Sequence, residues 1–187
     1  MEALRVVPKI FYFDTFKEFN EEFKIGKNDL VITNEFIYEP YMKPLGIDTN
    51  LIFQEKFGTG EPSDEMIDSM TKEMKKYNFD RIIAFGGGTI VDICKILALD
   101  VPEKSIDLFE GEVLPKKVKE LVVVPTTCGT GSEVTNVAIA ELKSKHTKRA
   151  CSRRNICRLC SVNSRDNKRI TLQILCYKFG RCSYTCY

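Results

Sequence analysis

The sequence predicts an α/β fold built around a parallel sheet. Short apolar runs alternate along the chain with segments of helical periodicity, which is the pattern of βαβ units. Three consecutive glycines directly follow one apolar run, as in a tight strand-to-helix turn. A chain of 187 residues is long enough for one substantial core but too short for a complete two-domain enzyme of ordinary size.

The predicted strands are short runs rich in Val, Ile and Leu, because a strand buried on both faces shows no polar alternation. They comprise residues 29–33, 51–53, 81–85, 121–125 and 137–142. Helices are predicted where apolar residues recur every three or four positions. They are a segment with Phe16, Phe19 and Phe23 on one face, a segment that starts at Pro62–Asp64 and runs through Tyr77, and a segment over 90–99. The phenylalanines are interpreted as core residues.

Charge and cysteine content divide the chain near Lys148. Residues 1–148 carry 19 Lys and Arg against 25 Asp and Glu, whereas residues 149–187 carry nine basic residues against one acid. The later segment also holds six of the eight cysteines. We therefore predict an α/β domain over 1–148 and a separate, disordered basic tail over 149–187.

Membrane and secreted proteins are the two classes that the sequence disfavours. No run approaches the roughly 18 apolar residues of a membrane span. Residues 1–5 show no basic segment leading into an apolar one, as a secretion signal requires. We expect a cytoplasmic protein without a membrane partner.

The glycine turn is the first candidate ligand site. Ligands of parallel sheets bind beyond the carboxyl ends of the strands, and Gly86, Gly87 and Gly88 lie at such an end. Glycines let backbone N–H groups approach a bulky anion, and the start of the following helix favours a phosphate. Neither the Gly-x-Gly-x-x-Gly pattern nor the P-loop pattern is present.

The predicted helix after the turn carries three further candidates. Thr89 is a candidate helix cap or phosphate donor. Asp92 and Lys95 are three residues apart and share one helix face. The alternative for the whole segment is an ordinary tight turn with an exposed ion pair. Three glycines in a row favour phosphate binding over that alternative.

A second polar loop, over 126–135, follows the predicted strand that ends at Pro125. It contains four threonines, one serine and two glycines. In a parallel sheet this loop opens at the same edge as the glycine turn. Two donor-rich loops at one edge fit a dinucleotide better than a single phosphate. A solvated loop without a ligand is the alternative.

These two segments carry a family resemblance. Gly-Gly-Gly-Thr-Ile-Val-Asp-Ile-Cys-Lys over 86–95 resembles the Gly-Gly-Gly-Ser/Thr-x-x-Asp-x-x-Lys motif of the iron-dependent (group III) alcohol dehydrogenases. Residues 124–135 resemble the second signature of the same family. The resemblance covers about residues 1–148, and the amino-acid sequence there is most similar to the branch of the family that acts on 4-hydroxybutyrate.

The resemblance implies a Rossmann-like domain that binds NAD or NADP, with the C-terminal helical domain of the family missing. It assigns the pyrophosphate to Gly87, Gly88 and Thr89 with Asp92 and Lys95 supporting the loop, the adenine–ribose side to Thr126 and Thr127, and the nicotinamide side to Thr135 and Val137. Asn34 ends the first predicted strand, where NAD-specific members often carry Asp for the ribose 2′-hydroxyl. Because Asn lacks the charge that repels a 2′-phosphate, the choice between NAD and NADP stays open.

The family reaction moves a hydride between nicotinamide and an alcohol carbon while a divalent metal, iron or zinc, polarises the oxygen. The resemblance implies one Asp and three His as metal ligands, whereas this sequence contains a single histidine, His146. We therefore expect no metal site here and no dehydrogenase activity from this chain alone. For the parent enzyme, the resemblance implies a small alcohol or hydroxy-acid substrate and a homo-oligomer.

We interpret residues 149–187 as the product of a shifted reading frame. With suitably chosen synonymous codons, the neighbouring frame converts 176–186 into a segment containing Asp-Ala-Leu-x-His-Ala, which resembles the family motif with two metal ligands. The same shift gives family-like sequence at two other places in the tail.

The rival interpretation of the tail is a zinc or nucleic-acid module attached to a non-catalytic nucleotide-binding domain. Cys157 and Cys160 form one Cys-x-x-Cys pair. Cys176, Cys182 and Cys186 are spaced by five and three intervening residues rather than two. This spacing disfavours the module, and we expect no nucleic-acid partner.

Overall fold

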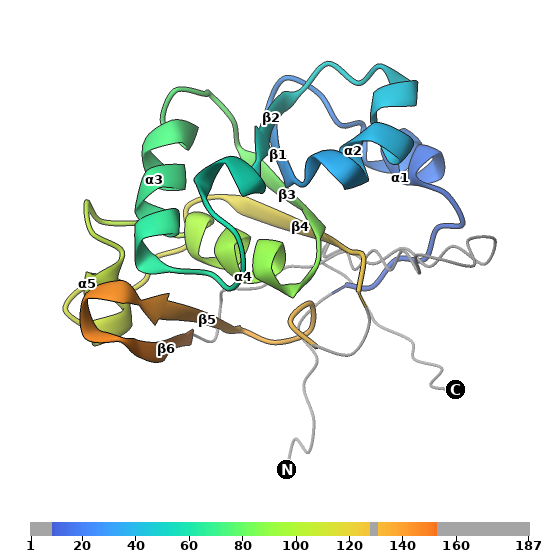
Figure 1. The fold of residues 1–187 in the computed structure, drawn as a ribbon. Helices are drawn as coiled ribbons and strands as arrows, with labels where there is room; N and C mark the ends of the chain where they lie inside the picture. Colours follow the sequence, from blue (N-terminus) through green and yellow to red (C-terminus); the bar gives the residue numbers. More distant parts are fainter. Residues whose placement is uncertain (1–8, 128–130, 153–187) are drawn as a thin grey trace, which may run out of the picture.

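The computed structural model describes residues 9–127 and 131–152 (Figure 1). Four strands form a parallel sheet in the order β2-β1-β3-β4. They are β1 Asp29–Thr33, β2 Asn50–Phe53, β3 Arg81–Gly86 and β4 Glu120–Pro125. The sequence-based prediction of an α/β fold with a parallel sheet is confirmed.

Alternate residues of each strand enter cores on opposite faces of the sheet, as the period of two requires. Val31 pairs with Ile83, and Ile83 with Val122, so side chains in one row point to the same face. One core contains Leu30, Ile32, Ile82, Ala84, Leu121 and Val123. The other contains Val31, Ile83, Phe85, Val122 and Val124. Because both faces are covered, these strands read as continuous apolar runs.

Helices cover both faces of the sheet (Figure 1). The α3 helix (Asp64–Met74) and the α4 helix (Gly88–Leu97) pack on the first face, and the α1 helix (Phe16–Phe23) and the α2 helix (Glu35–Tyr41) pack on the second. The short α5 helix (Ile106–Glu110) joins the first core. Short 3-10 turns lie at η1 (Lys43–Leu45), η2 (Gln54–Phe57) and η3 (Lys143–Lys145).

The predicted helix boundaries need two corrections. The α3 helix begins as predicted, with Ser63 as its cap accepting the Met66 N–H, but it ends at Met74 rather than Tyr77. Its last turn tightens, since Tyr77 N–H donates to the Met74 carbonyl three residues back. The α4 helix spans Gly88–Leu97 instead of 90–99. Gly87 is its N-cap residue and Gly88 is its first residue, so these two glycines start the helix rather than form a separate loop.

A hairpin forms a second, two-stranded sheet. The predicted strand over 137–142 exists as β5 (Val137–Leu142), but it pairs antiparallel with β6 (Thr147–Ser152) rather than with the parallel sheet. Ala138, Ala140 and Leu142 join the first core beneath α4. The β6 strand crosses the composition boundary after Lys148, and Cys151 is buried in the same core. From residue 153 onward, the predictions for the basic tail lie outside the described residues.

Within the described ranges, no helix combines the length and apolar character needed to cross a membrane.

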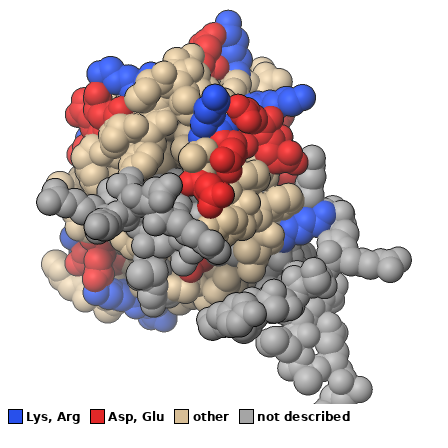
Figure 2. Space-filling view, turned by 90° about the vertical axis from the view of Figure 1, so that its right-hand side faces the viewer, with Lys and Arg blue, Asp and Glu red and all other residues tan. Residues whose placement is uncertain are grey.

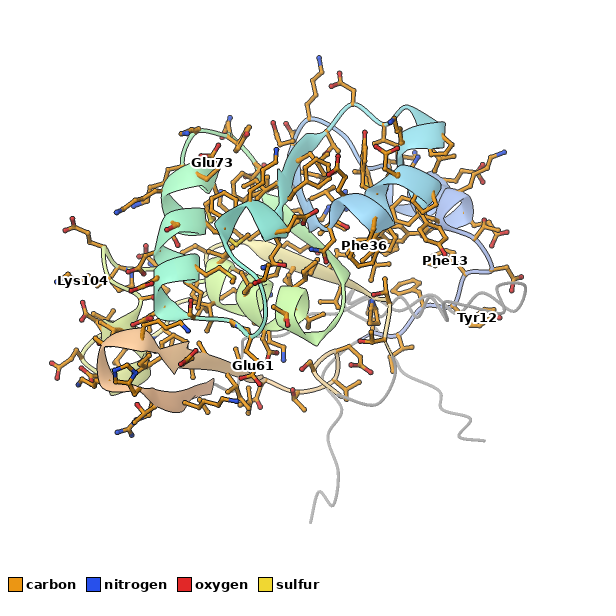
Figure 3. All side chains as sticks on the ribbon, viewed as in Figure 1. Tyr12, Phe13, Phe36, Glu61, Glu73 and Lys104 are labelled. Atoms are coloured by element: carbon orange, nitrogen blue, oxygen red, sulfur yellow. The ribbon has the colours of Figure 1, made fainter. Side chains whose placement is uncertain are left out.

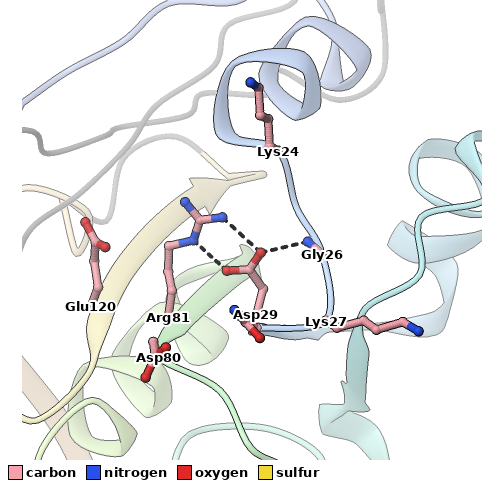
Figure 4. A pocket seen from close by; sticks show the side chains of 8 residues that line it. Lys24, Gly26, Lys27, Asp29, Asp80, Arg81 and Glu120 are labelled. Atoms are coloured by element: carbon pink, nitrogen blue, oxygen red, sulfur yellow. Dashed lines mark hydrogen bonds and ion pairs between the residues drawn. The ribbon is translucent and has the colours of Figure 1, made fainter.

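The amino-terminal edge of the sheet is closed by an internal ion pair. A hollow of about 420 Å³ at this edge is lined by Lys24, Gly26, Lys27, Asn28, Asp29, Asp80, Arg81 and Glu120. Inside it, Arg81 binds both oxygens of Asp29 at 2.6 and 2.9 Å, and Gly26 N–H donates to the same carboxylate at 2.8 Å (Figure 4). Arg81 also donates to the Phe23 carbonyl at 2.9 Å, which ties α1 to the sheet. We interpret these groups as structural.

Replacing Asp29 with Asn tests this interpretation. The Asp29 side chain is 5% exposed, so its loss leaves a largely buried guanidinium without its counter-charge. We expect Asp29→Asn to lower the free energy of unfolding by about 3 kcal/mol, measured by urea denaturation. Asp48→Asn is the matched control, because Asp48 pairs with Lys27 in full solvent exposure. Equal effects of the two substitutions would refute a structural role for the buried pair.

Candidate functional site

A pocket of about 500 Å³ lies at the carboxyl edge of the parallel sheet. Its lining residues come from the ends of all four strands and the elements that follow them. They are Asn34, Phe36, Ile37, Gln54, Gly60, Gly87, Gly88, Thr89, Ile90, Thr126 and Thr127. The structure therefore brings together Asn34, two of the three predicted glycines (Gly87 and Gly88) and the threonines Thr89, Thr126 and Thr127.

The strand order explains why the pocket forms at this place. The connection after β1 leads outward to β2, whereas the connection after β3 leads the other way to β4. Two chain segments therefore diverge between β1 and β3, at the position where open α/β sheets bind their ligands. Asn34 follows β1 and Gly87 follows β3, so both flank this point.

Gly86 and Gly87 have different roles. Gly86 is buried, and a Cβ atom there would lie 2.4 Å from Ile90 Cδ1, so this glycine lets α4 pack against β3. A Cβ atom at Gly87 would instead meet Thr127 Oγ1 at 3.5 Å, an ordinary contact distance on the pocket wall. The Thr126 N–H donates to the Gly86 carbonyl at 3.0 Å and fixes the second loop beside the glycine turn. Gly86 does not line the pocket.

The amino terminus of α4 supplies the polar wall. Gly88, Thr89 and Ile90 line the pocket, and the N–H groups at the start of a helix have no partners within that helix. They and the helix dipole favour an anionic group there. The prediction of Thr89 as the helix cap is wrong, since Gly87 occupies the cap position without a side-chain bond. The Thr89 hydroxyl donates to the Gly60 carbonyl at 3.3 Å.

Lys95 is completely buried, with 0% of its side chain exposed. Its ammonium group donates to Asp92 Oδ1 at 3.0 Å, to Thr135 Oγ1 at 3.2 Å and to the Val137 carbonyl at 2.6 Å. Asp92 Oδ2 accepts the Ile139 N–H at 3.3 Å. The pair is therefore not the exposed ion pair that the sequence allowed. It holds β5 on α4, and a buried charge with several oxygen partners is compensated.

Thr135 and Val137 accept hydrogen bonds from Lys95 at the partly exposed end of this link and do not line the pocket. Between the pocket and the link, residues 128–130 fall outside the described ranges. The structure thus separates the predicted residues into two groups. One group forms the pocket wall, and the other, with Asp92 and Lys95, anchors the chain that leaves the second loop.

Sequence reasoning missed the side of the pocket that α2 and β2 form. Phe36, labelled in Figure 3, is 69% exposed although it is a large aromatic residue, and it lines the pocket with Ile37. Gln54 and Glu55 follow β2, and the Glu55 carboxylate accepts Asn34 Nδ2 at 2.8 Å. The available signal was the switch from the apolar run 51–53 to polar residues, which marks the end of a parallel strand.

Charged side chains of both signs lie next to one another on the face seen in Figure 2.

The described residues contain no group of three or more His, Cys, Asp and Glu side chains placed to hold a metal ion. Burial raises the pKa of the Cys94 thiol well above its usual value, so it is a poor ligand. Residues 9–127 and 131–152 therefore offer no donor set for the catalytic metal that the resemblance implies.

Sequence comparisons link the chain to known oxidoreductases. The family described as iron-containing alcohol dehydrogenase matches residues 8–163. The chain is 52% identical to 4-hydroxybutyrate dehydrogenase of Clostridium kluyveri over 149 residues, which is 80% of this chain and 40% of that protein. It is 36% identical to mitochondrial hydroxyacid-oxoacid transhydrogenase of Xenopus laevis over 96 residues, which is 46% of this chain and 21% of that protein.

Solved structures share the fold. Sulfoacetaldehyde reductase from Bifidobacterium kashiwanohense, in complex with NAD+, matches 87% of this chain and 46% of its own with a TM-score of 0.70 and 17% identity. NADH-dependent butanol dehydrogenase A from Thermotoga maritima matches 88% and 44% with a TM-score of 0.71 and 22% identity. The chain thus spans less than half the length of these proteins.

Replacing Lys95 with Met tests its anchoring role. Methionine fills similar space but leaves Asp92 without its buried counter-charge. We expect Lys95→Met to lower the free energy of unfolding by about 3 kcal/mol and to speed amide exchange across β5. Lys76→Met is the matched control, because Lys76 lies just after α3 and its pair with Glu73 is open to solvent. Unchanged exchange in β5 would rule out the anchoring role.

Proposed function

Because the chain belongs to the iron-containing alcohol dehydrogenase family, we propose that its described residues form the NAD(P)-binding half of an oxidoreductase. One observation carries the proposal: the start of α4 and the Thr126–Thr127 segment face the same pocket beside two glycines. This wall offers backbone N–H groups, hydroxyls and a helix dipole to a pyrophosphate. The nicotinamide, when bound, is the group that accepts or returns the hydride.

The other wall of the pocket suits the adenosine end of the cofactor. Phe36 and Ile37 form an apolar surface next to polar Asn34. An exposed phenylalanine supports stacking of an adenine ring. The ribose then lies toward the ends of β1 and β2, and the pyrophosphate lies toward α4. Thr135 stays a proposed nicotinamide-side residue, held in place by Lys95.

For the whole enzyme, we propose oxidation of a primary alcohol such as 4-hydroxybutyrate to the corresponding aldehyde. The identity of 52% to 4-hydroxybutyrate dehydrogenase of Clostridium kluyveri supports this substrate class. The chain covers 40% of that relative. We propose that the metal and substrate groups belong to the part of the relatives that this chain does not cover, and that the 187 residues alone are inactive.

Calorimetric titration of the purified chain with NAD+ tests cofactor binding. We expect saturable binding that Gly87→Ala weakens by about tenfold, because a methyl group on the pocket wall keeps a pyrophosphate from the backbone. The fold tolerates this methyl, since its nearest contact is at 3.5 Å. Gly26→Ala is the matched control, because Gly26 has equal room at the opposite edge of the sheet. Absence of binding to both NAD+ and NADP+ would refute the proposed function.

An activity assay tests the proposed inactivity. The 187-residue chain with NAD+, 4-hydroxybutyrate and added Fe²⁺ or Zn²⁺ is expected to give no rise in NADH absorbance. The full-length Clostridium kluyveri enzyme serves as the positive control in the same assay. A metal-dependent rate from the purified chain would show that it contains a complete active site.

A further inference from the structure

We propose that Glu55 makes this site select NAD over NADP by accepting the 2′-hydroxyl of the adenosine ribose. The inference rests on the proposed function and adds a specificity residue to it. Glu55 follows β2, so it approaches the pocket from a different strand than Asn34, which follows β1. The Asn34 and Glu55 side chains are joined by a hydrogen bond in the folded chain.

Two hydrogen bonds fix the Glu55 carboxylate beside the pocket, and a third links Asn34 to the neighbouring Gln54. Asn34 Nδ2 donates to Glu55 Oε2 at 2.8 Å, and the Glu35 N–H donates to Glu55 Oε1 at 2.6 Å. Asn34 Nδ2 also donates to Gln54 Oε1 at 3.2 Å. Asn34 and Gln54 both line the pocket. The carboxylate is therefore held beside the pocket at a partly exposed position.

The charge of Glu55 persists at neutral pH. Partial burial raises the pKa of Glu55, but hydrogen bonds from the backbone of Glu35, from its own backbone and from Asn34 outweigh burial. The net pKa lies below its usual value. An ionised carboxylate accepts hydrogen bonds and donates none.

The rim therefore offers acceptors to a ligand. Both hydrogens of the Asn34 amide are directed to Gln54 and Glu55, so Asn34 has only its oxygen left to offer. A ribose hydroxyl donates and is satisfied by such a rim. A 2′-phosphate donates little, carries negative charge and is repelled by Glu55. Asn34 alone lacks this charge, and Glu55 supplies it.

Lys56 is the nearest sequence neighbour of opposite charge. Its ammonium lies 5.1 Å from the centre of the Phe53 ring, so it is engaged on that ring. A lysine near the rim is the one feature that could favour a phosphate instead. Lys56→Gln is therefore included in the test, and we expect it to leave the preference for NAD+ in place.

The test compares the dissociation constants of NAD+ and NADP+ for the full 187-residue chain by calorimetry. We expect the wild-type chain to prefer NAD+, and Glu55→Gln to reduce this preference by about tenfold. Glu73→Gln is the matched control, since Glu73 (labelled in Figure 3) lies on α3 and pairs with Lys76, whereas Glu55 is hydrogen-bonded to the pocket residue Asn34. Thermal melts establish that each variant is folded.

A wild-type measurement keeps the inference testable if Glu55→Gln does not fold. Because salt screens charge repulsion, higher ionic strength is expected to narrow the preference for NAD+. Binding of NAD+ with a preference that neither salt nor Glu55→Gln alters would overturn the role of Glu55 alone. Binding of neither nucleotide would overturn the proposed function and this inference with it.

Discussion

The buried ammonium of Lys95 is the interaction on which the arrangement of the site depends. It rises from α4, the helix whose start forms the polar pocket wall, and bonds the backbone of β5. Asp92 on the same helix face holds Ile139 of that strand. Because an unpaired charge at this depth is costly, the hairpin and the helix are stable only together. The chain leaving the second loop is thereby fixed to the helix whose first residues line the pocket.

The candidate site and the buried Asp29–Arg81 ion pair lie at opposite edges of the parallel sheet. At the amino edge, Asp29 and Arg81 neutralise each other and form hydrogen bonds with backbone groups. The two charged side chains in the hollow are therefore paired within the protein. At the carboxyl edge, the diverging connections of β1 and β3 leave a space that no element fills among the described residues. This asymmetry follows from strand direction, because helices that follow parallel strands start at the carboxyl edge.

Local patterns were sufficient to predict the sheet and most of the pocket wall. The apolar runs reflect burial on both faces, and the glycines and threonines after them report where the chain turns. The remaining features depend on contacts between segments that are distant in the sequence. The β5 strand pairs with Thr147–Ser152 instead of joining the parallel sheet, and its Val137 carbonyl accepts a hydrogen bond from the buried Lys95. Glu55, after β2, reaches Asn34, after the neighbouring β1. None of these contacts can be predicted from the spacing of neighbouring residues in the sequence.

The β6 strand is held to β5 through its backbone along the whole register from Thr147 to Ser152. Any residue except proline supplies the N–H and C=O groups of such a ladder, and the one described side chain of 149–152 that is buried here belongs to the small residue Cys151. The backbone ladder therefore places its main restrictions on proline anywhere in the strand and on the size of residue 151. In genetic terms, a change of reading frame at this point could preserve the backbone pairing of the hairpin while replacing the side chains that it carries.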